Sequence, residues 1–580
     1  MTRTLVLALI CAATLAPATH AQNRLLIPDT LSGSPQQLIL REGSIQFLPG
    51  TPTRTMGANG DILGPTLILH KNAPIELRVV NQLPDTTTIH WHGLHVAPRN
   101  DGGPHTPIPP GATWTPRFTV LDHASTYWYH PHLHHRTNEH VSRGLSGFII
   151  VRDDDESRLA LPRRYGVDDF PILVQTKSFD AANQVVVHNA LDTVLLVNAT
   201  RDPYLEVPGQ VIRLRLLNGS SERTYQFGFA NNHRFHQIGS DGGLLLAPLE
   251  TTRIRLSPGE RAEILVDLST FVGSDLTLQH FGGELTNGIY GAAQPGMGPG
   301  QRITGYTSNP LNGRTVPVLV LRVGSPTADA VTSVPATLVA DTPPNPALAQ
   351  RTRTFTFMPS VMGPTAIEGP FMINNAHFDM DVINEYVPFG TTEIWELRNE
   401  TPISHPFHIH NVQFRVLDIN GAPPPASHAG RKDVILVPAG MGVVRFLATF
   451  ETHYDDTIPY MYHCHMLTHE DHGMMGQFIV QSPPATSVAT FDAVAATPRI
   501  DAVHPHPVNA TGMITIALHR AGSARLTLHD ALGRHVRTLV DGWMRDGSHG
   551  IRLDVGDLAP GVYHLHLHAA GTSITRPLLH

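Results

Sequence analysis

The chain carries the stretch His463-Cys464-His465-Met-Leu-Thr-His469-Glu-Asp-His-Gly-Met474. A thiol lies between two imidazoles, and a further imidazole and a thioether follow it closely. Imidazole suits copper, and thiolate with thioether adds a preference for its softer, cuprous state. Residues two apart on a strand face the same side, so the imidazoles of His463 and His465 can converge on one site. The stretch therefore predicts a β-strand that presents metal ligands.

Three further clusters contain the same pairing of histidines two residues apart. They are His90-Trp91-His92, His130-Pro131-His132 and His405-Pro-Phe-His408-Ile-His410. A single pair of this kind is usually an ordinary surface or core feature. Four clusters, one of them built around a cysteine, indicate a copper protein.

The cysteine count supports a chemical role for Cys464. The sequence has two cysteines, and Cys11 lies inside residues 1–21, which we interpret as an export signal. Arg3 precedes the mostly apolar stretch Leu5–Pro17, and a small residue, Ala21, ends the segment. The apolar stretch is too short for a permanent membrane anchor. After removal of the signal, one cysteine remains in an exported protein, where chemistry is its expected use.

Composition excludes some classes of function. The 580 residues carry a formal net charge of −8, and the basic residues form no long block, so nucleic acid is not an expected partner. The 49 glycines and 48 prolines suit many short strands joined by turns.

Strand-length apolar runs recur along the chain, for example Pro65–His70, Val211–Leu217 and Val434–Val437. Their spacing, with turn residues between them, favours β-sandwiches over alternating strands and helices. Two stretches rich in Pro, Ala, Thr and Ser, 326–349 and 485–502, are predicted linkers. The predicted domains are 22–160, 161–325, 350–484 and a small β-domain at 503–580.

The four clusters resemble the copper-binding signatures of the multicopper oxidases, the family of laccases, bilirubin oxidases and cuprous oxidases. The resemblance covers Asp61 to Gln481 and includes Asp101-Gly-Gly-Pro104, Arg213–Asn218 and Phe378-Asp-Met380. It implies an all-β fold of three cupredoxin-like Greek-key β-sandwiches. It also implies oxidation of a substrate one electron at a time, with dioxygen reduced to water.

The resemblance further implies the copper ligands. His405, Cys464 and His469 would bind a type 1 copper, with Met474 as the weak axial ligand. His90 and His408 would bind a type 2 copper. The type 3 pair would take His92, His130, His132, His410, His463 and His465, which makes four copper ions in all. Because the first and third domains both supply ligands, the cluster should lie at their interface, with the second domain as a spacer.

Reduction of dioxygen also needs protons. Asp101 follows the first cluster, and Glu470 follows ligand His469 directly. The resemblance places acidic residues at both positions, where they would relay protons and orient ligand imidazoles. The alternatives are a surface turn for Asp101 and a solvated charge for Glu470.

The tail, Val503 to His580, contains Arg525-Leu-Thr-Leu-His-Asp-Ala-Leu-Gly-Arg534 and Leu558-Ala-Pro-Gly-Val-Tyr563. This pattern resembles the immunoglobulin-like sorting domains of the type IX secretion system. Its opening, His504-Pro-His-Pro507, departs from the usual pattern of that family. The resemblance implies secretion machinery as a partner and a periplasmic, cell-surface or extracellular location. His564, His566 and His568 alternate and would share a face, which we interpret as a solvated polar surface rather than an accessory copper site.

Several functions remain open at this point. A laccase-like oxidase would act on phenols or aromatic amines, whereas a metal-ion oxidase would act on cuprous or ferrous ions. The methionines are scattered, and Thr401 stands where cuprous oxidases carry an acidic residue, which favours organic substrates. A redox-inactive relative would be expected to lack ligands, and a two-domain nitrite reductase needs a different ligand set.

Overall fold

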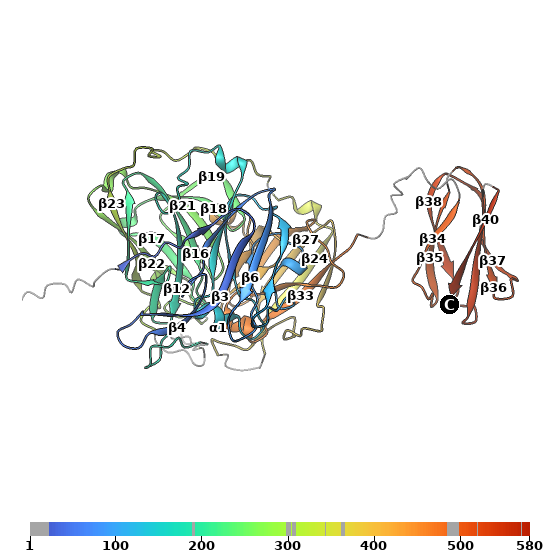
Figure 1. Ribbon diagram of the computed structural model, residues 1–580, viewed down its shortest axis with the longest axis horizontal. Helices are drawn as coiled ribbons and strands as arrows, with labels where there is room; N and C mark the ends of the chain where they lie inside the picture. The colour runs from blue at the N-terminus through green and yellow to red at the C-terminus, as the bar shows by residue number, and fades with distance from the viewer. Residues whose placement is uncertain are drawn as a thin grey trace, which may run out of the picture. The chain divides into compact units, whose positions relative to one another are not determined.

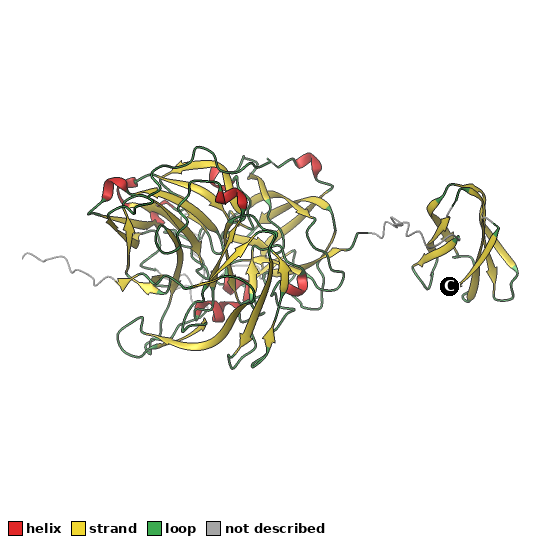
Figure 2. Cartoon of the chain, turned by 45° about the horizontal axis from the view of Figure 1, so that its top comes forward, coloured by secondary structure: helices red, strands yellow, loops and turns green. Residues whose placement is uncertain are grey.

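The computed structural model describes residues 23–187, 192–296, 303, 309–342, 344–360, 366–483, 498–518, 520–569 and 571–580. The predicted signal and most of the predicted linker 485–502 lie outside these ranges. Strands dominate the described part, and its helices are short (Figure 2). None of these helices is both long enough and apolar enough to cross a membrane.

The first sandwich pairs two sheets around one core. The first sheet runs β2 (Thr30–Leu31), β5 (Thr66–His70), β11 (Gly147–Arg152), β10 (Ser125–His130) and β7 (His90–His92). The second runs β4 (Thr53–Ala58), β3 (Gln36–Ile45), β6 (Pro74–Asn81) and β8 (Thr113–Trp114), with β9 (Arg117–Thr119) also paired to β6. Figure 1 shows β3 and β6 side by side in blue. Burial alternates along β6, as expected for a strand with one face in the core.

The second sandwich is larger. One sheet runs β1 (Asn23–Arg24), β15 (Pro203–Pro208), β23 (Thr315–Gly324), β22 (Asp275–Phe281), β17 (Tyr225–Phe229) and β20 (Ile254–Leu256). The other runs β14 (Thr200–Arg201), β13 (Val194–Val197), β12 (Asp169–Lys177), β16 (Val211–Asn218), β21 (Arg261–Asp267), β18 (Phe235–Ser240) and β19 (Gly243–Thr251). Every position of β12 and β16 is buried, so this sheet is covered on both faces.

The third sandwich carries most of the predicted ligands. Its first sheet runs β25 (Phe371–Ile373), β24 (Arg351–Pro359), β27 (Thr391–Asn399), β31 (Gly442–Phe450) and β29 (Arg415–Ile419). Its second runs β26 (Glu385–Pro388), β33 (Met475–Gln481), β32 (Tyr460–Cys464), β28 (His405–Ile409) and β30 (Val434–Val437). Trp395, Phe407 and Phe478 form the aromatic centre of the core between the two sheets.

The tail has a separate core. One sheet runs β34 (Arg499–His504), β35 (Thr511–Leu518) and β38 (Gly547–Asp554); the other runs β37 (His535–Met544), β36 (Gly522–Asp530), β39 (Val562–Ala569) and β40 (Thr572–Leu579). Pro483–His580 is one compact unit, and Met1–Ser482 is the other. The predicted all-β fold is confirmed.

Short helices connect the strands. The α-helices are α1 (Thr137–Ser142), α2 (Asp154–Ser157) and α3 (Leu467–Asp471). The 3-10 helices are η1 (Pro98–Asn100), η2 (Ala230–Asn232), η3 (Ser269–Phe271), η4 (Gly282–Glu284), η5 (Pro346–Leu348) and η6 (Ala426–His428). The Asp471 carboxylate of α3 accepts hydrogen bonds from the backbone N–H groups of Thr137 and Asn138 in α1, each 3.0 Å long. A carboxylate at a helix N-terminus is favourable, so this contact ties the first sandwich to the third.

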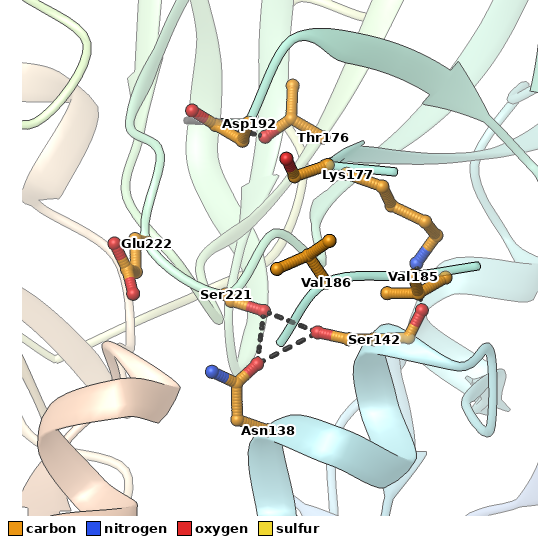
Figure 3. A pocket seen from close by; sticks show the side chains of 10 residues that line it. Asn138, Ser142, Thr176, Lys177, Val185, Val186, Asp192, Ser221 and Glu222 are labelled. Atoms are coloured by element: carbon orange, nitrogen blue, oxygen red, sulfur yellow. Dashed lines mark hydrogen bonds between the residues drawn. The ribbon is translucent and has the colours of Figure 1, made fainter. Parts of the chain in front are cut away.

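A small polar cavity of about 30 Å³ lies beside α1 and β12. Figure 3 shows Asn138, Ser142 and Ser221 joined in a triangle of hydrogen bonds, with Lys177 reaching toward Ser142. The Lys177 ammonium donates to the Ser142 carbonyl (2.7 Å), and the Thr468 hydroxyl of α3 donates to Glu222. The cavity has room for water but not for an organic substrate.

Two ionisable groups of this cavity are fully buried. Burial raises the pKa of Glu222 to about 8, and burial lowers the pKa of Lys177 to about 7. Both shifts favour the neutral form, because the low-dielectric interior disfavours charge. The Glu222 carboxyl therefore keeps its proton in the folded chain at a pH where an unfolded chain would lose it.

We expect the stability of Glu222→Gln, relative to the natural chain, to rise with pH. Between the ordinary pKa of 4.5 and about 8, the folded chain binds more protons at this site than the unfolded chain does. Glu222 therefore lowers the free energy of unfolding progressively as pH rises through that window, and glutamine has no such effect. Melting temperatures measured from pH 5 to pH 9 should show the difference widening up to about pH 8. The exposed Glu451→Gln serves as control, and a pH-independent difference would contradict the prediction.

Candidate metal centre

Four neighbouring strands bring the predicted ligands together. In the first sandwich, β7 pairs with β10 so that His90 lies opposite His130. In the third, β28 pairs with β32 so that His408 lies opposite His463. Helix α3 follows β32 and carries His469. Histidines far apart in the sequence therefore meet through strand pairing and through the contact between the two sandwiches.

One group consists of a thiol and two imidazoles. The Sγ atom of Cys464 lies 3.5 Å from Nδ1 of His405 and 3.6 Å from Nδ1 of His469. All three side chains are buried, and so is Met474, whose carbonyl accepts the N–H of Cys464 (3.0 Å). The Phe371 ring packs against both imidazoles. The pocket therefore offers soft donors in an apolar surrounding.

The outer nitrogens of these two imidazoles are both fixed. Nε2 of His405 lies 2.7 Å from the Thr401 hydroxyl, and Nε2 of His469 donates to the Ile367 carbonyl (2.9 Å). These contacts hold each ring with its Nδ1 lone pair toward Cys464. A metal that binds there would meet ligands that are already oriented.

A second group consists of eight buried imidazoles. Potential ligand nitrogens gather in three sets: His90 with His408 and His410; His92 with His130 and His465; and His132 with His410 and His463. Nδ1 of His92 lies 3.3 Å from Nε2 of His130 and 3.3 Å from Nε2 of His465. The sets draw on both the first and the third sandwich, as expected from the sequence.

The hydrogen bonds of three of these rings indicate whether the cluster suits a metal ion. Nδ1 of His90, His408 and His410 donates to the Asp101 carbonyl, the Asp433 carbonyl and the Asp101 carboxylate, respectively. Nε2 of each ring is buried and has no hydrogen-bond partner among the described residues. Unpartnered buried acceptors are costly, and a metal ion would satisfy them. The donor set fits copper.

Burial also favours the neutral form of six of the cluster imidazoles. The pKa values of His92, His130, His132, His408 and His465 lie well below the ordinary value because of burial and the neighbouring rings. For the same reasons the pKa of His410 falls to about 4. Neutral imidazole is the form that binds metal.

The two predicted acidic residues lie in contact with the cluster, and neither is exposed to solvent. The Asp101 carboxylate accepts the Nδ1 proton of His410 at 2.7 Å. The Glu470 oxygens lie 3.3 Å from Nδ1 of His132 and 3.1 Å from Nδ1 of His463. Burial raises the pKa of both carboxyls, but the adjacent imidazoles outweigh it and hold both pKa values below the ordinary range.

Burial raises the pKa of the Cys464 thiol. The thiol therefore keeps its proton at neutral pH unless a cation replaces it. A metal ligand must be deprotonated, so metal binding here releases a proton. The backbone N–H of Met466, 3.5 Å from Sγ, points at the sulfur and stabilises negative charge on it.

The structure adds residues that sequence reasoning missed. Asp433 lies 3.1 Å from Nε2 of His92 and forms a buried ion pair with Arg261 of the second sandwich. Arg261 thus links the second sandwich to the cluster through one carboxylate. Neither residue belongs to a recognisable spacing, because their contact joins positions 172 residues apart.

Comparisons with known proteins agree with this arrangement. Family profiles described as multicopper oxidase match residues 40–156, 186–274 and 341–484, and one described as a secretion system C-terminal sorting domain matches 502–579. The chain is 31% identical to a multicopper oxidase of Staphylococcus haemolyticus, over 80% of this chain and 94% of the relative. It is also 31% identical to the cell division protein FtsP of Photorhabdus laumondii, over 79% of this chain and 93% of that protein.

A solved structure gives the same result. A laccase-like multicopper oxidase from Ochrobactrum sp. superposes with a TM-score of 0.69 at 31% identity, covering 79% of this chain and all of that one. This likeness extends over the three sandwiches rather than over the copper motifs alone. The chain therefore belongs to the multicopper oxidase family, the copper oxidoreductases that use dioxygen as acceptor, and it carries a secretion sorting domain after the oxidase.

Proposed function

We propose that this chain is a laccase-like oxidase that takes single electrons from phenols or aromatic amines and reduces dioxygen to water. The observation that supports it is the joining of two buried ligand groups by three consecutive residues, His463-Cys464-His465. We assign the type 1 copper to His405, Cys464 and His469, with Met474 axial. We assign the type 2 copper to His90 and His408, and the type 3 pair to His92, His130, His132, His410, His463 and His465.

Four bound copper ions would supply one-electron acceptance at the first group and dioxygen reduction at the second. The chain's own part is to hold the two groups at a fixed, short separation. The covalent path from the Cys464 sulfur to His463 or to His465 follows the backbone between adjacent residues. The rigid imidazoles of both groups limit rearrangement when an electron passes.

Protons must accompany the electrons. Asp101 and Glu470 each lie against imidazoles that we assign as ligands. Their carboxylates orient these rings and can pass protons toward the reduced oxygen. Because burial separates both groups from bulk water, each proton has to arrive along hydrogen-bonded groups or internal water.

The surroundings of His405 support an organic donor. The group beside its outer nitrogen is the neutral, buried hydroxyl of Thr401 rather than a carboxylate that would bind a metal ion. The Gly440 N–H donates to the Thr401 carbonyl (2.9 Å), and Gly440 lines an open hollow of about 660 Å³ together with the exposed Met441. A phenol could dock in a hollow of this size. The Ochrobactrum relative is described as active towards lignin model compounds.

We also propose that the chain is exported. A sorting domain follows the oxidase, and residues 1–21 have the composition of a signal. Periplasm, cell surface and medium are all consistent with these features. The reducing substrate would then be met outside the cytoplasm.

Replacement of the thiol tests the type 1 assignment. Cys464→Ser should fold, since serine is similar in shape, but it should lose the intense visible absorption of a copper–thiolate bond and all oxygen uptake with phenols. Elemental analysis should show one copper fewer per chain than in the parent. Met513→Leu, in the tail, is the control. Retention of the blue colour in the serine variant would refute the assignment.

Replacement of the carboxylates tests the proton role. Asp101→Asn and Glu470→Gln should each slow oxygen-dependent reoxidation by roughly a hundredfold, because proton transfer is impaired. Anaerobic bleaching of the blue colour by a phenol should keep its rate, since electron entry does not use these groups. Stopped-flow absorbance separates the two steps. The exposed Asp275→Asn is the control, and equal slowing of both steps would argue against a proton role.

A substrate comparison separates the laccase-like function from the metal-ion oxidase. We expect oxygen consumption by the copper-replete protein to be faster with phenols and aromatic amines than with cuprous or ferrous ions, given the neutral Thr401. Oxygen consumption with each of these four kinds of reductant is measured with an oxygen electrode in the same buffer. Faster turnover with either ion would overturn the substrate assignment, and no turnover with any would favour a redox-inactive relative.

A further inference from the structure

The tail sheet has one face of leucines and one face of imidazoles. Leu526, Leu528, Leu565 and Leu567 of β36 and β39 are fully buried in the tail core. Directly opposed residues of an antiparallel pair share a face, and residues two apart on a strand do as well. The histidines that alternate with these leucines therefore point away from the core.

His529 of β36 is the centre of this polar face. It lies opposite His535 on β37 and opposite His564 on β39, so three imidazoles form one row across three strands. His566, two residues after His564, adds a fourth from the same face. The ring centroids of His529 and His566 are 4.4 Å apart, and those of His529 and His535 are 5.5 Å apart. The sequence alone revealed only the alternation along β39.

Hydrogen bonds select which nitrogen of His529 carries the lone pair, and in the ion-free chain this nitrogen accepts from a hydroxyl. Its Nδ1 donates to the Gly533 carbonyl (3.1 Å), which leaves the lone pair on Nε2. That nitrogen lies 3.0 Å from the Thr527 hydroxyl. His564 and His566 are half-buried and His535 is exposed, so an ion has access from solvent.

We propose that His529, His564 and His566 form a binding site for a divalent transition-metal ion on the sorting domain, with His535 or water as a further ligand. His564 and His566 are two apart on one strand, His529 lies opposite His564 on the adjacent strand, and all three side chains lie on the same face of the sheet. Three imidazoles suit zinc and cupric ions. Ion binding would require these solvent-facing rings to rotate, and the ion would replace the Thr527 hydroxyl on Nε2 of His529. The site is independent of the oxidase coppers, because its residues belong to the other compact unit.

The test uses the full-length, copper-replete protein and zinc as the probe, so that the added ion is distinguished from copper. After dialysis against zinc and then against buffer, elemental analysis should find one zinc per chain, and calorimetry should give one binding event. The double variant His529→Asn/His566→Asn should lose the zinc and bind at least about tenfold more weakly. The single variant His564→Asn should also bind more weakly.

The matched control is His504→Asn/His549→Asn, which removes two histidines from the other sheet of the tail. It should retain the zinc with unchanged affinity. Oxygen uptake and the melting temperature of all variants should match the parent, since no core side chain changes. Equal loss in both double variants would mean unspecific binding to surface histidines and would overturn the proposal, as would a parent chain that retains no zinc.

Discussion

The alternation of side chains along one strand is the constraint on which the rest of the site depends. His463 and His465 are two apart and belong to the histidine cluster, whereas Cys464 between them belongs to the other group. A strand directs successive residues to opposite sides, so β32 and its extension serve two groups at once. A shift of register by one residue would exchange the thiol with the imidazoles and dismantle both groups.

Burial of the histidine cluster also destabilises the folded chain, and the surrounding contacts offset part of this loss of stability. Eight buried imidazoles include nitrogens without hydrogen-bond partners among the described residues. Asp101 and Asp433 each use a backbone carbonyl to hold a ring, and each carboxylate lies against another ring. Arg261 then holds Asp433 in a paired geometry, since a buried carboxylate without a partner would be unfavourable.

The sequence was sufficient for features that depend on spacing along the chain. Histidines two residues apart, strand-length apolar runs and one cysteine after the predicted signal are local patterns, and they predicted β-sandwiches and paired imidazoles. The full set of ligands was implied by the resemblance to a known family and not by these patterns alone. The sequence did not predict contacts between distant segments of the chain. The Asp433–Arg261 pair and the Glu222 cavity arise from packing between sandwiches, where no local pattern specifies the partner. The sequence revealed only part of the row of tail imidazoles. The histidines of β39 alternate along the sequence, but their pairing with β36 could not be predicted from it.

Burial of the Cys464 thiol has a consequence for the protein before copper binds. Cysteine oxidation follows exposure and thiolate character, and Cys464 has neither, being fully enclosed with a raised pKa. Cys464 is also the free cysteine of the described chain, so folding there needs no disulfide exchange. If the chain is exported before it binds copper, the folded protein would therefore keep Cys464 reduced until the metal binds.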